Sequence, residues 1–444
     1  MMSYSKRPFL RVALVLPLLL GGCSLWDDWF GTPKVPLPGT RIAILAPTTG
    51  LEIAKTGVPK ITLPAPAVNA EWPQSGGVPS HSMEHPAAAD GLNRVWGSGI
   101  GAGGGYRRKI TAQPIIAGGR VFTMDSDAVV AAFDAGTGRQ AWSLSTQESE
   151  DRSTNVGGGI ASDGGVVYAA TGRADLLALD AATGAVKWRV RLPAGARAAP
   201  TVAAGKLFIP LLDSQLVAYA AADGVKSWSY QASTVEPIVL GLPSPAFADG
   251  LLLAGFGSGD LVALNPLSGA VVWAESLAAS RGRNSLADLS TIRGRMVIKA
   301  GRVYAVSLGQ QLAALDLRSG RRLWEREVSS AETPWVAGDW LFIASLGGQI
   351  AAISLLDGQV AWVTQLDTFE NMEKKKDPIR WLGPVLAGDR LVVAGTNGVA
   401  FALSPYTGQV LGREKLSGGA ALAPVVAGGT VYIVTDDAAL TAYR

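Results

Sequence analysis

Short apolar runs that flank a glycine-containing turn recur along most of the chain. In "PIIAGGRVF" (residues 114–122) the positions around the turn are β-branched or aromatic, and the same pattern occurs eight times. Glycine supplies the positive φ that a tight hairpin turn needs, and β-branched and aromatic residues favour strands. Each run therefore predicts an apolar β-hairpin. The runs are residues 114–122, 160–168, 200–208, 245–253, 296–304, 334–342, 384–392 and 424–432.

A second, more polar phrase follows the first seven of these hairpins. In "ALDAATGAVKW" (residues 178–188) a short strand leads into a turn at Thr183 and Gly184, and a return strand ends at Trp188. The seven copies end at residues 142, 188, 228, 273, 324, 362 and 412, which places them 38 to 51 residues apart. A period of this length is typical of repeat architectures. Each repeat therefore predicts two hairpins that form one unit of four antiparallel strands.

Eight such units predict an all-β, eight-bladed β-propeller over residues 90–444, because a lone four-stranded sheet would leave both of its faces in water. The eighth unit ends at residues 440–444, directly after its third strand. Residues 90–96 have the glycine-to-tryptophan pattern of a fourth strand. We therefore expect this N-terminal strand to complete the last blade, so that the ring is closed by both termini and leaves no free sheet edge.

The tryptophan that ends most copies of the second phrase is predicted to pack on the neighbouring blade, near small residues of the same phrase. This is a structural role without a ligand. One copy has Gly412 at this position, which predicts a weaker outer seam there. The tryptophans are Trp96, Trp142, Trp188, Trp228, Trp273, Trp324 and Trp362.

The first 22 residues have the features of an export signal. Lys6, Arg7 and Arg11 precede an apolar run at residues 12–20 that is too short to span a bilayer. Residues 23–89 follow, with ten prolines between Pro33 and Pro86. Proline lacks an amide donor and restricts the residue before it, so long helices and central strands are disfavoured. We interpret residues 23–89 as a tether, in which short apolar pieces could still dock.

The single cysteine, Cys23, ends the sequence "LGGC". This sequence resembles the lipobox of bacterial lipoproteins, which implies that residues 1–22 are a lipoprotein signal peptide and that Cys23 is the acylated N-terminus. Ser24 in place of an aspartate implies an outer-membrane destination. The alternative is a plain secretory signal with an incidental cysteine. With one cysteine the chain cannot form an internal disulfide.

Composition narrows the classes of partner. The formal net charge is +3 and charged residues make up 17% of the chain. No stretch gathers enough lysine and arginine to follow a phosphate backbone, so nucleic acid is not an expected partner.

The second phrase resembles the AxDxxTGxxxW repeat of pyrroloquinoline-quinone (PQQ) type propellers, and "WPQSGG" (residues 72–77) resembles the segment before their first blade. With the lipobox and eight lean blades, the chain resembles the BamB-type outer-membrane assembly lipoproteins. That resemblance implies a non-enzymatic scaffold, anchored to the outer membrane by lipid and facing the periplasm. It also implies binding to a BamA-type insertase and assistance to unfolded outer-membrane protein precursors.

A PQQ-dependent quinoprotein dehydrogenase is the alternative function. Such enzymes typically carry adjacent cysteines over the quinone, which one cysteine cannot provide, so no cofactor is expected. His81 and His85 have the i, i+4 spacing of metal ligands but lie between Pro79 and Pro86 without an obvious third ligand. A docking role for this segment is the preferred interpretation over a metal site.

Partner contact is expected on the face of the ring that carries the links between blades, because the lengths of these links vary. The longest are residues 277–295 and 364–381, and loops of this length are usually functional or disordered. The BamB-type resemblance places partner contacts in two loops. The candidate residues are Leu192, Arg197, Leu286, Asp288 and Ser290.

Overall fold

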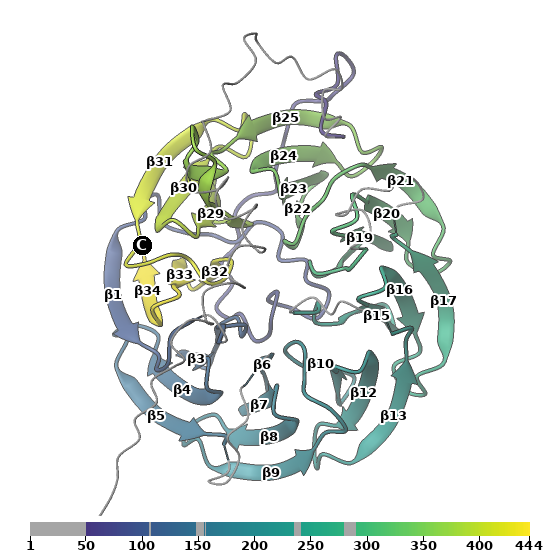
Figure 1. The fold of residues 1–444 in the computed structure, drawn as a ribbon, viewed down its shortest axis with the longest axis vertical. Coiled ribbons are helices and arrows are strands. Elements are labelled where there is room, and N and C mark those ends of the chain that lie inside the picture. Colours follow the sequence, from purple (N-terminus) through teal and green to yellow (C-terminus); the bar gives the residue numbers. More distant parts are fainter. Residues whose placement is uncertain (1–49, 106–107, 148–154, 156, 235–240, 279–289) are drawn as a thin grey trace, which may run out of the picture. The chain divides into compact units, whose positions relative to one another are not determined.

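Eight four-stranded antiparallel sheets stand around a central axis in the computed structural model (Figure 1). The structure describes residues 50–105, 108–147, 155, 157–234, 241–278 and 290–444. The predicted all-β, eight-bladed propeller is confirmed. In the described residues there is no helix long and apolar enough to cross a membrane. Blades 1 to 5 are β2–β5, β6–β9, β10–β13, β14–β17 and β18–β21, and blades 6 to 8 are β22–β25, β28–β31 and β32–β34 with β1.

Each blade begins with a short inner strand near the axis, and the predicted apolar hairpin joins it to a second strand. The inner strands are β2 Ile115–Ala117, β6 Gly158–Asp163, β10 Thr201–Ala203, β14 Ala246–Ala248, β18 Val297–Lys299, β22 Trp335–Ala337, β28 Trp381–Leu386 and β32 Val425–Ala427. The second strands are β3 Arg120–Met124, β7 Val166–Thr171, β11 Lys206–Pro210, β15 Leu251–Gly255, β19 Arg302–Val306, β23 Trp340–Ala344, β29 Leu391–Gly395 and β33 Thr430–Val434.

The third and outer strands come from the second phrase. The third strands are β4 Val129–Asp134, β8 Asp175–Asp180, β12 Gln215–Ala220, β16 Asp260–Leu264, β20 Leu312–Asp316, β24 Gln349–Ser354, β30 Val399–Leu403 and β34 Ala439–Tyr443. The outer strands are β5 Gln140–Ser145, β9 Val186–Arg191, β13 Lys226–Gln231, β17 Val271–Ser276, β21 Arg322–Arg326, β25 Val360–Gln365, β31 Val410–Lys415 and β1 Arg94–Gly99.

The N-terminal strand closes the ring as predicted. β1 pairs antiparallel with β34, and the register joins Trp96 to Ala442 and Gly99 to Ala439. The last blade is therefore built from both ends of the propeller sequence, and the sheet that would otherwise lack its outer strand is complete.

Burial differs between strands in the way that stacked blades require. Nearly every residue of β7 and β8 is buried, because both faces of these strands pack against neighbouring blades. The outer strand β9 alternates between exposed and half-buried residues, since only one of its faces meets protein. The apolar content of the repeats is thus used between blades, in layers of valine, leucine, isoleucine and alanine.

The polar phrase forms a turn in which side-chain hydrogen bonds support the backbone. Asp134 Oδ1 accepts hydrogen bonds from the backbone N–H of Thr137 at 2.8 Å and from its hydroxyl at 2.7 Å. These bonds lower the pKa of the Asp134 carboxyl, with the Thr137 hydroxyl as the largest cause. Asp180 and Thr183 repeat the arrangement at 3.0 Å. The aspartate and threonine of the phrase therefore fix the turn between the third and outer strands.

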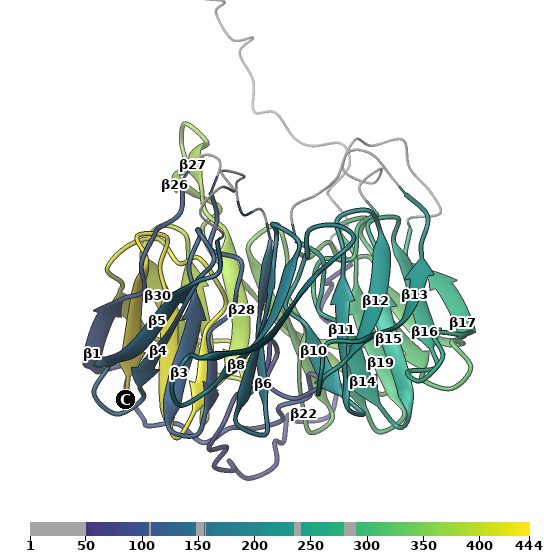
Figure 2. The same cartoon turned by 90° about the horizontal axis from the view of Figure 1, so that it is seen from below.

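An additional hairpin projects from the link between blades 6 and 7 (Figure 2). It consists of β26 Phe369–Asn371 and β27 Lys376–Pro378, which form a separate two-stranded sheet. Most of its residues are exposed, including Met372 at 54%.

Candidate partner-binding face and axial cavity

The two faces of the ring carry different connections. Strands run antiparallel, so the turns after the inner and third strands lie on one face, which we call the turn face. The turns after the second strands and the links between blades lie on the other, the link face (Figure 2). The extra hairpin belongs to a link and so stands on the link face.

Residues 69–88, the axial segment, cross the middle of the turn face (Figures 1 and 2). They contact the blades in sequence. Hydrogen bonds join the segment to blades 8, 1, 2 and 3 in turn. The pairs are Asn69 with Val426, Trp72 with Ile116, Pro73 with Ser162 and Gln74 with Val202. Blades 4 to 7 are met through Pro79 with Phe247, Ser80 with Ile298, Glu84 with Gly338 and Pro86 with Gly388, and Ala88 returns to blade 8 at Gly429.

Most of these contacts are short hydrogen bonds to the inner strands. Trp72 and Ile116 exchange two backbone bonds of 2.8 and 2.9 Å. The amide of Gln74 accepts from Val202 N at 3.0 Å and donates to Val202 O at 3.4 Å. Because one segment bonds to every blade, it joins the inner ends of all eight sheets. Residues 50–89 therefore do not form a free tether, and the part of the predicted tether that precedes residue 50 lies outside the described residues.

Both histidines of the axial segment are buried and hydrogen-bonded to backbone carbonyls. His81 Nδ1 lies 2.7 Å from Met296 O. His85 has Pro64 O at 2.6 Å from Nδ1 and Gly388 O at 2.8 Å from Nε2. Burial, with the charge of Arg295 as a second cause, lowers the pKa of His81 to about 3. The two side chains thus serve in docking this segment on separate blades.

The candidate partner-binding residues fall into two groups. Leu286 and Asp288 lie outside the described residues, as does Cys23, and Ser290 is half-buried. Leu192 is 3% exposed and packs in the apolar core between blades 2 and 3, and Arg197 is 4% exposed and lines a cavity on the axis. Their link runs inward before it enters β10, so neither side chain is available on the outer surface.

The axial cavity has a volume of about 360 Å³. Most of its wall comes from the links that lead into every blade except blade 2. Ser75 of the axial segment, Leu382 of β28 and Asp436 of the turn between β33 and β34 also line it. The charged side chains around it are Lys109, Arg197, Arg293, Arg295, Arg380, Glu332 and Asp436. Of these seven residues, the sequence analysis named only Arg197. The signal that could have found Arg293, Arg295, Glu332 and Arg380 is their shared place just before an inner strand, where the chain passes the axis.

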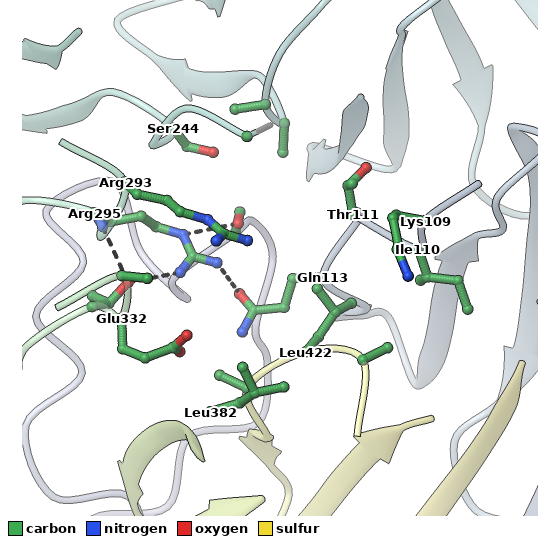
Figure 3. Close-up of a pocket in the computed structure, with 18 of the residues that line it drawn as sticks. Lys109, Ile110, Thr111, Gln113, Ser244, Arg293, Arg295, Glu332, Leu382 and Leu422 are labelled. Atoms are coloured by element: carbon green, nitrogen blue, oxygen red, sulfur yellow. Dashed lines mark hydrogen bonds between the residues drawn. The ribbon is translucent and has the colours of Figure 1, made fainter. Parts of the chain in front are cut away.

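Arg295 is held on one side of this cavity by neutral acceptors (Figure 3). Its guanidinium donates to Ser75 Oγ at 2.9 Å, Thr333 Oγ1 at 2.9 Å and Gln113 Oε1 at 3.0 Å. Burial lowers the pKa of Arg295 to about 10, and the charge of Glu332 opposes that shift. Arg295 therefore remains a cation at neutral pH and connects the axial segment to the links into blades 1 and 6.

These residues do not fit a calcium–quinone centre. Calcium takes six to eight oxygen ligands, several of them carboxylates. The cavity offers Glu332 and Asp436, and three arginines act on the Glu332 carboxylate and would repel a cation there. Across the described ranges, no group of three or more His, Cys, Asp or Glu side chains is placed to hold a metal ion.

The repeat and the ring define a PQQ-like repeat propeller. The family model for the outer membrane protein assembly factor BamB matches residues 95–155, 126–364 and 365–444. The chain belongs to the BamB family.

Individual relatives agree with this assignment. A BamB from Burkholderia pseudomallei is 28% identical over 83% of this chain and 91% of its own length. A BamB from Yersinia pestis is 31% identical over 53% of this chain and 61% of its own length, so that alignment spans less than two thirds of the relative.

Solved structures share the fold. The crystal structure of BamB from Moraxella catarrhalis has a TM-score of 0.68 and 22% identity, and covers 80% of this chain and all of its own. A quinohemoprotein alcohol dehydrogenase from Comamonas testosteroni has a TM-score of 0.65 and 16% identity, and covers 85% of this chain and 81% of its own. At these identities the likeness concerns the architecture of the propeller.

Proposed function

We propose that this protein is a non-enzymatic scaffold of the outer-membrane β-barrel assembly machinery, which binds a BamA-type insertase and aids the delivery of unfolded outer-membrane protein precursors. The observation that carries the proposal is membership of the BamB family over residues 95–444. The described cavity supports it, since its donor set does not suit the calcium–quinone chemistry of the dehydrogenases with the same fold.

The insertase binds the link face in this proposal. The axial segment covers the middle of the turn face, whereas the link face presents the variable links and the exposed hairpin β26–β27. Met372 and Leu346 are apolar side chains on this face that are 54% and 48% exposed. The link of residues 277–295 contributes Leu286, Asp288 and Ser290 to the contact. Charged residues at such a rim mainly set orientation and the rate of association.

The anchor is Cys23, acylated after removal of residues 1–22, with the propeller in the periplasm at the outer membrane. Two or more acyl chains hold a protein at a membrane, because each buried methylene contributes about 0.8 kcal/mol. Labelling with a radioactive fatty acid tests this part. Cys23→Ala should lose both the label and membrane attachment, and a labelled Cys23→Ala protein would contradict the assignment.

Co-purification from membranes tests the insertase contact. Asp288→Lys reverses a charge in the link of residues 277–295, and Asp223→Lys reverses an exposed charge on the turn face as a matched control. The wild type and the control should recover the insertase, and Asp288→Lys should recover less. Equal recovery with both variants would remove Asp288 from the interface, and no recovery with the wild type would remove the function.

The dehydrogenase alternative has a direct test. The protein is incubated with PQQ and calcium, and dye reduction is measured with alcohols and sugars. We expect no rate above that of the heat-denatured protein, and a substrate-dependent rate would establish the enzyme.

A further inference from the structure

The axial cavity holds an excess of positive charge. Five cationic side chains line it, against the two carboxylates of Glu332 and Asp436. In the described ranges, no carboxylate oxygen lies within 4.0 Å of the guanidinium groups of Arg293, Arg295 or Arg380. Arg293 is half-buried and Arg380 is exposed at the edge of the cavity. Gathering like charges in a partly desolvated place without a close ion pair is unfavourable, because the charges repel each other and lose part of their hydration.

Glu332 compensates these charges only in part. Its Oε2 accepts a hydrogen bond from Gly383 N at 3.1 Å. Burial raises the pKa of Glu332, against the opposing effects of this bond and of Arg293, Arg295 and Arg380. One carboxylate thus faces three guanidinium groups without a direct contact to any of them.

Two of these guanidinium groups are free to take a ligand. The guanidinium group of Arg295 already donates hydrogen bonds to Ser75, Thr333 and Gln113. The guanidinium groups of Arg293 and Arg380 make no hydrogen bond within the described part of the chain. Burial lowers the pKa of Arg293, the charge of Glu332 opposes this shift, and the charge of Arg380 adds to it. Two like charges therefore act on each other in a partly desolvated site, and an anion between them would relieve the repulsion.

The rest of the wall is mixed, with apolar side chains beside polar ones such as Thr111 and Ser244. Ile110, Leu382 and Leu422 line the same cavity (Figure 3). Guanidinium groups bind carboxylate and phosphate oxygens through paired N–H donors. The apolar side chains beside the arginines suit a ligand that joins an anionic group to a short carbon skeleton. A volume of about 360 Å³ has room for such a molecule.

We propose that the axial cavity is a binding site for a small organic anion that presents carboxylate or phosphate groups to Arg293 and Arg380. The cavity is lined by residues of the same links that the proposed insertase contact uses, including Arg293 and Arg380. Its test uses the purified protein without the insertase, so the two proposals can fail separately. Glu332 lowers the affinity for the anion, because its negative charge competes with the ligand for the same cations.

Isothermal titration calorimetry on the full-length protein in detergent tests the site. The probes are succinate, methyl phosphate and, as a neutral analogue, succinamide, all at constant ionic strength. Succinate or methyl phosphate should bind, and the stronger of the two identifies the preferred group. Succinamide should not bind, since it lacks the charge that the arginines recognise.

Three variants decide whether the cavity is responsible. The double variant Arg293→Gln with Arg380→Gln should weaken binding by about a hundredfold or more, because two charge-assisted hydrogen bonds to the anion are lost. Arg139→Gln changes an exposed arginine on the turn face and should leave binding unchanged. Glu332→Gln keeps the acceptor for Gly383 and should tighten binding, an effect that misfolding would not produce.

The proposal is overturned if neither anion binds, if succinamide binds as well as succinate, or if the double variant binds as tightly as the wild type. If the double variant does not fold, Glu332→Gln decides alone, and unchanged or weaker anion binding by that protein would reject the site.

Discussion

The indole of Trp142 lies against Gly184 of the next blade, so closely that a Cβ on Gly184 would come within 2.7 Å of the ring. The indole N–H donates to Ala181 O of the same turn at 3.1 Å. The relation is general. The seven pairs are Trp96 with Gly138, Trp142 with Gly184, Trp188 with Gly224, Trp228 with Gly269, Trp273 with Gly320, Trp324 with Gly358 and Trp362 with Gly408.

Gly184→Ala should destabilise the ring through two separate effects. Gly184 has a φ of +77°, and a Cβ there also meets Trp142. Gly205 has a φ of +70° with no atom within 4 Å of its Cβ position, so Gly205→Ala isolates the backbone cost of about 1–2 kcal/mol. Urea unfolding should show a clearly larger loss for Gly184→Ala. Equal losses of unfolding free energy in the two variants would mean that the indole of Trp142 moves aside for the added methyl group without destabilising the ring.

The absence of a tryptophan at position 412 has a structural reason. Gly412 ends the seventh copy, and its neighbour, blade 8, has no turn between its third and outer strands, because β34 and β1 come from the two ends of the propeller. No heavy atom lies within 4 Å of a Cβ placed on Gly412. A tryptophan there would have no glycine turn to cover.

Trp362→Ala and Gly412→Trp should therefore differ sharply. Trp362 is 7% exposed and donates to Pro405 O at 3.0 Å, so its loss should cost about 3–5 kcal/mol of unfolding free energy. Restoring the repeat consensus with Gly412→Trp should leave stability nearly unchanged. Chemical denaturation compares the two, and a marked stabilisation by Gly412→Trp would show that blade 8 offers a packing surface after all.

Stability should fall as the pH is lowered from about 6.5 towards about 3, because the pKa of His81 is 6.5 in the unfolded chain and about 3 in the folded one. Between these pH values the imidazole of His81 is protonated in the unfolded chain but stays neutral in the folded protein, where it is buried beside Arg295. Glu332 lines the same small pocket, and its raised pKa acts in the opposite direction. Glu332 is present both in the wild type and in a variant that lacks His81, so its contribution cancels when their unfolding free energies are compared.

His81→Asn is the matched variant for this pH effect. Asparagine does not titrate and tolerates the φ of +59° at this position. The variant should have a flatter dependence of unfolding free energy on pH below 6.5, measured by denaturant titrations at several pH values. If wild type and variant show parallel curves, His81 does not resist protonation in the folded ring.

The sequence predicted the parts of the fold that repeat. The closing strand β1, the eight blades and the two-hairpin unit follow from spacing and turn chemistry, since these contacts depend on residue types such as Asp134, Thr137 and Gly184. The axial segment was interpreted as a tether because its contacts are mostly backbone hydrogen bonds, such as those that Pro73 O and Pro79 O accept, and such bonds leave little trace in the residue types.

The axial cavity was not predictable for a related reason. Arg293, Glu332 and Arg380 are 39 to 87 residues apart in the sequence and meet only because separate links approach the axis. Leu192 and Arg197 became partner-contact candidates through the resemblance to BamB-type loops. Their burial could not be predicted, because a link of irregular structure has no alternation from which the inward direction could be read.

Site-specific photocross-linking in intact cells tests most directly the central claim that this scaffold meets its partner through the link face. A photoreactive residue replaces Met372 or Leu346 on the link face, or Leu356 on the turn face, which is 72% exposed. The account predicts cross-links to the BamA-type insertase from Met372 or Leu346 and none from Leu356. Cross-links to the insertase from Leu356 alone would contradict it.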